Sequence, residues 1–446
     1  MKQFLVLTSI LMCACSTGSV EDKAIAHNPE FLHRSVKEIT DRIVHDIFSP
    51  PVAARIYAYS CIAGYEAMVP SDPTYNSLSG QLNGLEPVPQ PDLTLEYCFP
   101  LASIQATLQV GRALIFSESD LDEFYEQVMT ELKQSGIPDD VYDRSIEYGK
   151  VVAAHILDWS SKDNYKQSRS FPKYTIVDDP ATWKPTPPAY MDAIEPSWNA
   201  IRPFVLDSAD QFVPAPPTPF SKEVESTFYK EALEVYESGN GLSDEQRSIA
   251  SFWDCNPFVM NVHGHVMYAT KKISPGGHWM NITRVICTQT KSDFMASAEA
   301  YARVAITLAD GFISCWDEKY RSKLIRPETY INQYIDENWK PTLQTPPFPE
   351  YTSGHSVISS AAAVTLTHFF GEQVAFVDST EVEFGLPMRK FNSFKEAAEE
   401  AAISRLYGGI HYRPAIDQGL IQGRSVGDWV VKNIKTRKEQ AVALQQ

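Results

Sequence analysis

The sequence predicts an all-α fold, and three observations support that prediction. Apolar residues recur at helical spacing over most of the chain. Runs of alternating β-branched residues, which would indicate half-buried strands, are scarce. Prolines are concentrated in one stretch, residues 171–220, where long regular helices cannot form. We therefore expect helices on both sides of that stretch and few strands.

Residues 24–170 are expected to form the first helical region. Val36, Ile39 and Ile43 lie at the spacing of one helix face, and the prolines at positions 50 and 51 separate this helix from a second one. Similar patterns predict further helices over residues 100–117, 119–135 and 139–162.

Eleven prolines lie between Phe171 and Phe220, so residues 171–220 are expected to form a long crossing. Helical periodicity then resumes over residues 221–239, 243–253 and 292–318. Residues 221–435 are therefore expected to form a second helical domain.

The composition excludes two broad classes of protein. Lys and Arg number 39 against 56 Asp and Glu, and this net charge of −17 disfavours binding to nucleic acid phosphates. After the N-terminus, no apolar run approaches the roughly 20 residues that a membrane-spanning helix needs. The negative charge also means that any anion site must depend on a local cluster of cations.

The N-terminus has the pattern of an export signal. Lys2 precedes the apolar run Phe4–Met12, which is too short for a membrane span. A small residue directly before Cys15 resembles the bacterial lipoprotein cleavage pattern. We expect residues 1–15 to act as a signal peptide, with cleavage before Cys15 and acylation of that cysteine. This predicts a periplasmic or outer-membrane lipoprotein that touches the membrane only through its lipid. An ordinary signal peptide, or acylation at Cys13, is the alternative.

The other cysteines and several histidines carry weaker signals. The five cysteines after Cys15 have neither CxxC spacing nor histidines at zinc-site spacing, so no zinc site is predicted, and a disulfide stays open. The pair His263 and His265 has no third ligand nearby. His278 and Trp253 are equally compatible with a cleft and with packing.

Three short motifs in the C-terminal half carry the chemistry. They are Lys319-x6-Arg326-Pro327, Ser353-Gly354-His355 and Ser404-Arg405-x5-His411. Together they supply three cations, a hydroxyl, a glycine amide and two imidazoles. Arginine forks and a lysine charge can neutralise a phosphate-like ion from several sides, so the motifs predict a site for a tetrahedral oxyanion.

The local context supports this arrangement. Ser353 directly precedes a helical run over residues 356–370, so its hydroxyl and the Gly354 amide should lie at a helix N-terminus, which favours anions. A capping box at Ser393 starts another helix, and Gly408-Gly409 ends it, which places His411 on a turn.

The three motifs resemble those of the superfamily of vanadium haloperoxidases and type 2 phosphatidic acid phosphatases. The stretch Pro346–Ser356, together with Trp316, resembles the haloperoxidase branch and particularly the bacterial iodoperoxidases. Trp183–Pro188 and Pro275–Trp279 resemble that branch too. The resemblance covers roughly residues 180–430.

This resemblance implies a fold of two packed four-helix bundles and an enzyme that oxidises halide, iodide above all, with hydrogen peroxide. It implies vanadate bonded to His411 as the metal ligand and His355 as the acid–base group. Lys319 would polarise the peroxide, and Trp316 and Phe348 would line the halide pocket, although these two residues also match a pattern of the chloroperoxidases. The vanadate oxygens would be held by Lys319, Arg326, Ser353, Gly354 and Arg405.

Two alternatives share the same residues. A phosphomonoesterase or lipid phosphatase would use His411 as its nucleophile, but such phosphatases commonly carry an acidic residue four positions later, where this chain has Ala415. That departure leaves the partner of the second His411 nitrogen unassigned. The second alternative is a non-enzymatic lipoprotein that binds an oxyanion, but such a protein would have no use for an acid–base group at His355.

Overall fold

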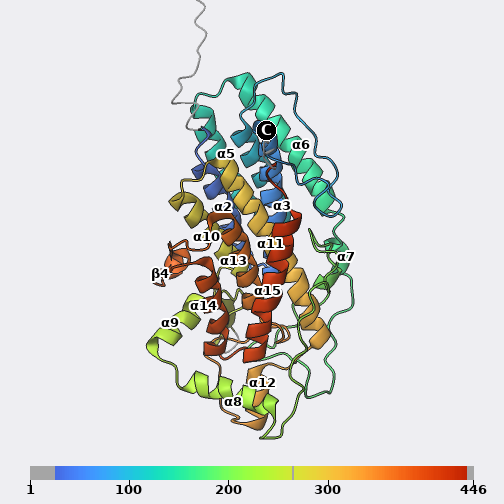
Figure 1. Ribbon diagram of the computed structural model, residues 1–446, viewed down its shortest axis with the longest axis vertical. Coiled ribbons are helices and arrows are strands. Elements are labelled where there is room, and N and C mark those ends of the chain that lie inside the picture. The colour runs from blue at the N-terminus through green and yellow to red at the C-terminus, as the bar shows by residue number, and fades with distance from the viewer. Residues whose placement is uncertain (1–25, 264–265, 439–446) are drawn as a thin grey trace, which may run out of the picture.

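The computed structural model describes residues 26–263 and 266–438, and most of their regular structure is helical, so the all-α prediction is confirmed (Figure 1). Helices α5 and α6 lie toward one end of the molecule and α8 and α12 at the other. The N-terminal helices are α2 (Glu30–His45), α3 (Pro50–Met68), η1 (Val69–Ser71), α4 (Phe99–Leu114), α5 (Glu118–Gln134), α6 (Asp139–Ser160) and α7 (Tyr165–Ser168).

Helix α3 is the centre of the N-terminal bundle because every one of its residues is buried. It packs against α4, α6 and α11. Small residues permit this close approach: a Cβ on Gly64 would lie 2.3 Å from Oγ1 of Thr107 in α4. A Cβ on Gly149 of α6 would likewise lie 2.6 Å from the carbonyl oxygen of Ala102.

The proline-rich crossing contains one short helix, η2 (Trp198–Ala200), and is fixed to the long helix behind it. The buried carboxylate of Asp310 accepts hydrogen bonds from the amides of Phe204, Val205 and Leu206 at 2.7, 2.7 and 3.1 Å. Burial nevertheless raises the pKa of Asp310 to about 6. These bonds satisfy backbone groups that a crossing without regular structure would otherwise leave unpaired.

The C-terminal region is built around α11, which packs against α3 on one side and against α13 and α15 on the other. Helices α13 and α15 approach closely because a Cβ on Gly423 would lie 2.2 Å from the carbonyl oxygen of Val357. The helices of this region are α8 (Thr227–Asn240), α9 (Asp244–Phe252), α10 (Pro275–Gln289), α11 (Phe294–Ser322), α12 (Pro327–Tyr334), α13 (Gly354–Phe370), α14 (Phe394–Tyr407) and α15 (Arg413–Asn433).

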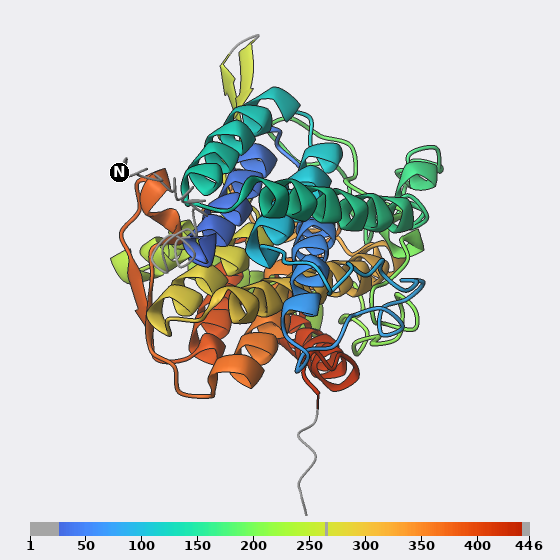
Figure 2. The ribbon, with the colours of Figure 1, turned by 90° about the horizontal axis from the view of Figure 1, so that it is seen from above.

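Two small antiparallel hairpins and one short helix lie in the connections between these helices. They are β1 (Met260–His263) with β2 (Val266–Ala269), β3 (Phe376–Asp378) with β4 (Arg389–Phe391), and η3 (Thr380–Phe384). The β1–β2 hairpin projects from the body of the molecule (Figure 2). The sequence did not predict these hairpins, because strands of three or four residues carry too little periodicity to detect.

Three sequence-based expectations concern the chain ends and the cysteines. Cys13 and Cys15 lie outside the described residues, as do Gly264 and His265. Among the helices of the described ranges, none combines the length and apolar character needed to cross a bilayer. None of the five described cysteines forms a disulfide, and all five are buried.

Candidate active site

Residues of the second and third motifs line one small cavity, about 30 Å³ in volume, between α11, α13 and the turn that joins α14 to α15. Arg326 of the first motif does not line this cavity but contacts His411, which does. Six of the residues predicted to hold or act on an oxyanion or its halide line this cavity, namely Trp316, Phe348, Gly354, His355, Arg405 and His411. The lining is completed by Pro50, Cys255, Asn256, Pro257, Pro275, Phe312, Pro346 and Ile410.

His411 lies on the predicted turn, after α14 ends at Gly408 and Gly409. Gly409 has φ +74°, a left-handed conformation that favours glycine. The Nδ1 atom of His411 lies 2.8 Å from Oε1 of Glu350, and Nε2 lies 3.1 Å from Nη1 of Arg326. Since guanidinium only donates, this network assigns the proton to Nδ1 and leaves Nε2 with its lone pair. Burial, reinforced by Arg326, lowers the pKa of His411 well below its ordinary value, so the ring is neutral.

Glu350 is the partner that the sequence left unassigned. Its Oε1 also accepts a hydrogen bond from the Tyr412 amide at 3.0 Å, while Oε2 is buried without a hydrogen-bond partner in the described part of the chain. Burial raises the pKa of Glu350 to about 8, against the opposing effect of Arg326 and Lys319. Glu350 lies in the stretch that resembles haloperoxidases, but no sequence signal shows that it faces a histidine 61 residues later.

Arg326 precedes α12, where Pro327 occupies the first helical position. It is fully buried, and its Nε and Nη1 donate to the carbonyl oxygens of Phe348 and Ile410 at 2.9 and 2.8 Å. Its Nη2 is buried and has no hydrogen-bond partner among the residues described. Burial lowers the pKa of Arg326 to about 10, so the group stays cationic at neutral pH. The Nη2 group of Arg326 is therefore a charged donor that can bind a ligand.

Lys319, near the end of α11, is fully buried beside the same loop. Its Nζ donates to the carbonyl oxygens of Pro349 and Glu350 at 3.1 and 3.0 Å, and also to that of Thr352. These three bonds use all of its hydrogens, so direct contact with a ligand requires one of them to be exchanged. Burial lowers the pKa of Lys319 to about 8. In this structure Lys319 supplies charge and supports the loop.

Ser353 and Gly354 begin α13 as the sequence predicted. Ser353 is the N-cap residue, and its Oγ accepts a hydrogen bond from the Ser356 amide at 3.3 Å. The Gly354 amide lies in the first helical turn, where N–H groups have no carbonyl one turn earlier to bind. A Cβ on Gly354 would lie 3.7 Å from the Trp316 ring, so a side chain there would occupy the cavity.

His355 and Arg405 are both held by the backbone of Trp253. Nη2 of Arg405 donates to the Trp253 carbonyl, and its Nε donates to Oγ of Ser404 at 2.9 Å. His355 also forms a hydrogen bond with the Trp253 backbone, and its Nε2 is buried without a partner in the described ranges. Burial and then Arg405 lower the pKa of His355 well below its ordinary value. His355 is therefore neutral, with one nitrogen directed away from its backbone partner.

Three aromatic rings, those of Phe312, Trp316 and Phe348, line part of the cavity. The ring centroids of Trp316 and Phe348 lie 5.0 Å apart, and those of Trp316 and Phe312 lie 5.4 Å apart. The indole N–H of Trp316 donates to the Ile194 carbonyl at 3.2 Å, so it is directed at the proline-rich crossing. This wall is therefore apolar toward the cavity.

Of the two residues that the sequence left open, Trp253 supports the site through its carbonyl, as described above. His278 does not line the cavity. It is fully buried behind Trp253, with the two rings stacked at 4.5 Å. The structure thus brings all three motifs together and places His278 in a separate cluster.

Similarity to known proteins indicates the family of this chain. The family model described as the VCPO second helical-bundle domain matches residues 299–439. The crystal structure of the first bacterial vanadium-dependent iodoperoxidase is 51% identical, with a TM-score of 0.88 over 93% of this chain and 98% of that chain. No curated protein matches the sequence.

Two further solved structures share the fold at low identity. The holo form of a bacterial vanadium-dependent chloroperoxidase is 15% identical, with a TM-score of 0.68 over 87% of this chain and 93% of that chain. An apo form of such a chloroperoxidase is 16% identical, with a TM-score of 0.67 over 86% and 94%. At this identity the likeness concerns the fold alone.

Proposed function

Since this chain belongs to the family of vanadium-dependent haloperoxidases, we propose that it is an iodoperoxidase that holds vanadate at His411. The chain is an enzyme that oxidises halide with hydrogen peroxide, and vanadate is the cofactor of its family. The preference for iodide and the roles of individual residues are the parts that we propose.

The observation that carries this proposal is the neutral His411 ring among buried cations. Its Nε2 lone pair lies beside Arg326, and the Nη2 of that arginine is buried without a partner in the described residues. Arg405 and the N-terminus of α13 line the same cavity. One nitrogen ligand, charged donors and helix amides are the groups that a tetrahedral oxyanion needs, so these residues fit vanadate.

When bound, vanadate supplies the electrophilic centre at which hydrogen peroxide becomes reactive toward halide. Glu350 keeps the proton on Nδ1 of His411, which holds the ring in place and leaves Nε2 unprotonated, with a lone pair that now accepts from Nη1 of Arg326 and would be given to the metal instead. Arg326, Arg405 and Lys319, all three buried, would stabilise negative charge on a bound oxyanion. These groups are already in position because backbone carbonyls hold each of them.

His355 is suited to move protons. Its bond to the Trp253 backbone orients the ring, and the unpaired Nε2 of the neutral ring can accept a proton from hydrogen peroxide. The resulting imidazolium can then donate that proton as hypohalous acid and water are formed, which restores the neutral ring. Arg405 limits how long the charged form persists, because it lowers the pKa of His355.

Iodide is favoured for two reasons. Iodide gives up electrons more readily than bromide or chloride, so it needs the least activation of the oxidant. In addition, the relative that is 51% identical over nearly the whole chain is described as an iodoperoxidase. The aromatic wall of Trp316 and Phe348 is also suited to a large, weakly hydrated anion.

The test is triiodide formation from iodide and hydrogen peroxide by vanadate-reconstituted protein. We expect turnover with iodide, little with bromide and none measurable with chloride at matched pH and peroxide. Chloride turnover comparable to that of iodide would refute the preference. Phosphate ester hydrolysis, measured with and without vanadate, tests the phosphatase alternative, which the comparisons do not favour.

Replacing Glu350 with glutamine should weaken vanadate binding about 10–100-fold, the usual effect of removing the partner of a metal-binding histidine. Glutamine keeps the size of the side chain but removes the carboxyl group that accepts the Nδ1 proton of His411. Equilibrium dialysis measures the affinity. Glu66→Gln is a matched control, because Glu66 is also buried with a raised pKa but lies in α3. Equal affinity in both variants would contradict the role of Glu350.

Oxyanion affinity should fall as the pH rises through about 8. The lowered pKa of Lys319 means that its ammonium is present below that pH and lost above it. Glu350 becomes anionic over the same range, so both changes reduce the positive charge of the site. Sulfate is a useful probe because its own charge does not change between pH 6.5 and 9.5.

Isothermal titration calorimetry with sulfate measures this pH dependence. A bound anion stabilises the Lys319 ammonium, so the loss of affinity should be displaced to a somewhat higher pH than in the free protein. In Lys319→Met the decline should become shallower, since only Glu350 then titrates. Affinity that stays constant from pH 7 to 9 would show that neither group titrates there.

We also propose that the chain is exported and acylated at Cys15, from the lipoprotein-like pattern of its first residues. Labelling of cells with a radioactive fatty acid should mark the wild-type protein and fail with Cys15→Ser. Equal labelling of both proteins would reject this proposal.

A further inference from the structure

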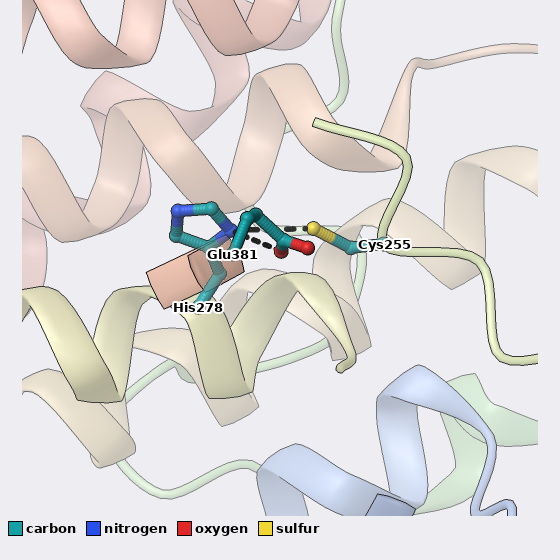
Figure 3. A group of neighbouring side chains, drawn as sticks. All are labelled: Cys255, His278 and Glu381. Atoms are coloured by element: carbon teal, nitrogen blue, oxygen red, sulfur yellow. Dashed lines mark hydrogen bonds and ion pairs between the residues drawn. The ribbon is translucent and has the colours of Figure 1, made fainter. Parts of the chain in front are cut away.

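A second cluster of buried polar side chains adjoins the cavity, and one of its members, Cys255, also lines it. Cys255 from the loop after α9, His278 from α10 and Glu381 from η3 converge from three separate segments (Figure 3). All three side chains are buried. The mechanism proposed above uses none of them, so their convergence needs another explanation.

Two of the three separations between the candidate ligand atoms match those around a tetrahedral metal ion. Nδ1 of His278 lies 3.4 Å from Sγ of Cys255 and 3.3 Å from Oε1 of Glu381, and all three atoms lie within 4.8 Å of one another. Zinc binds sulfur at about 2.3 Å and nitrogen or oxygen at about 2.0–2.2 Å. Tetrahedral angles then place neighbouring ligands roughly 3.3–3.7 Å apart.

The second nitrogen of His278 has the partner that metal-binding histidines usually have. Nε2 lies 2.7 Å from Oδ2 of Asp378, which is fully buried. The other oxygen of Asp378 accepts hydrogen bonds from the amide and hydroxyl of Thr380, so the carboxylate is held firmly. A proton on Nε2 leaves Nδ1 with a lone pair, directed at Cys255 and Glu381.

An independent observation indicates that something binds between these groups. Oε1 of Glu381 is buried and has no hydrogen-bond partner within the described residues, although Nδ1 of His278 lies close to it. An unpaired buried carboxylate oxygen is costly, and Asp378 adds a second buried carboxylate. A divalent cation bound to Sγ, Nδ1 and Oε1 would satisfy both the unpaired oxygen and the excess negative charge.

A proton on Nδ1 is the competing occupant. Burial lowers the pKa of His278, but Asp378 and Cys255 outweigh it and raise that pKa well above its ordinary value. One proton can form one good hydrogen bond, whereas two acceptors converge on Nδ1. A metal ion can satisfy all three atoms together.

We propose that Cys255, His278 and Glu381 bind one divalent cation that favours sulfur, with Zn²⁺ as the best match, and that Asp378 orients His278. Zn²⁺ takes sulfur, nitrogen and oxygen ligands together in tetrahedral sites. The cation would join the Cys255 loop to α10 and η3. That loop carries the Trp253 carbonyl that holds Arg405, so the cation would act as a structural support of the cavity wall.

The test uses full-length protein that has been stripped with a chelator and titrated with Co²⁺ in the absence of vanadate. We expect one equivalent to bind and to produce a thiolate-to-cobalt charge-transfer absorption, which Zn²⁺ then abolishes by displacement. This readout does not depend on halide oxidation, so failure here would leave the proposed function untouched.

Cys255→Ser should remove the charge-transfer band. Cys287→Ser should keep the band. Cys287 is a buried thiol on α10, the helix that carries His278, but it is not one of the three proposed ligands. If Cys255→Ser fails to fold, Asp378→Asn provides the second measurement and should weaken Co²⁺ binding about 10–100-fold. Absence of stoichiometric binding, or an unchanged band in Cys255→Ser, would overturn the proposal in favour of the protonated cluster.

Discussion

The variant His411→Ala is expected to lose halide oxidation down to the level of free vanadate without protein. Nε2 of His411 is the proposed ligand atom for the metal, and its position depends on Glu350 on one side and Arg326 on the other. Alanine removes this atom and leaves Arg326, Lys319 and Arg405 clustered around an unfilled space. The cations can still attract an anion, but they provide no ligand to the metal.

Two measurements check this prediction. Triiodide formation at saturating vanadate measures turnover, and equilibrium dialysis followed by metal analysis measures affinity. His368→Ala is the control, because His368 is exposed near the C-terminal end of α13, whereas the second motif lies at the start of that helix. Wild-type turnover in His411→Ala would show that the metal is held elsewhere.

The helices and their boundaries were largely predictable because they depend on local signals. Ser393 caps α14 and accepts a hydrogen bond from the Glu396 amide at 3.1 Å, as the sequence predicted. The reciprocal half of the capping box differs, since the Glu396 carboxylate binds the Asn392 amide at 2.6 Å. Gly408 and Gly409 end α14 as predicted, since these glycines interrupt the helix over a few residues.

The convergence of the three motifs was also predictable, because cations and a helix N-terminus are both suited to bind an oxyanion. The contacts that support these residues could not be predicted. Glu350, the backbone of Trp253 and the carbonyls around Lys319 act across 30 to 152 residues of sequence. Such pairings depend on how helices pack, which no local pattern encodes.

The cluster of Cys255, His278 and Glu381 was even less predictable from local sequence patterns. Its three side chains come from residues 255, 278 and 381, and this spacing matches no zinc motif that a sequence reader would recognise. The short elements that position two of them, η3 and the loop after α9, were not predicted as structural features. Only the folded chain brings a thiol, an imidazole and a carboxylate to one point.

The variant His355→Ala is expected to keep most of its vanadate affinity but to lose turnover by about 10²–10⁴-fold, the usual effect of removing an acid–base group. Arg326, Arg405 and His411 are held by partners other than His355, so the oxyanion site should persist. The proton acceptor that disappears is the unpaired Nε2 of a neutral ring.

The distinction between a catalyst and a ligand lies in which kinetic constant changes. Loss of acid–base catalysis lowers kcat at saturating vanadate and iodide, whereas loss of a ligand raises the vanadate concentration needed for activity. An added weak base of small size, such as imidazole, should restore part of the rate in His355→Ala by entering the space that the ring occupied. If vanadate affinity collapsed while kcat at saturation stayed normal, His355 would be a ligand, and the proton transfer would have to be assigned to another group of the cavity.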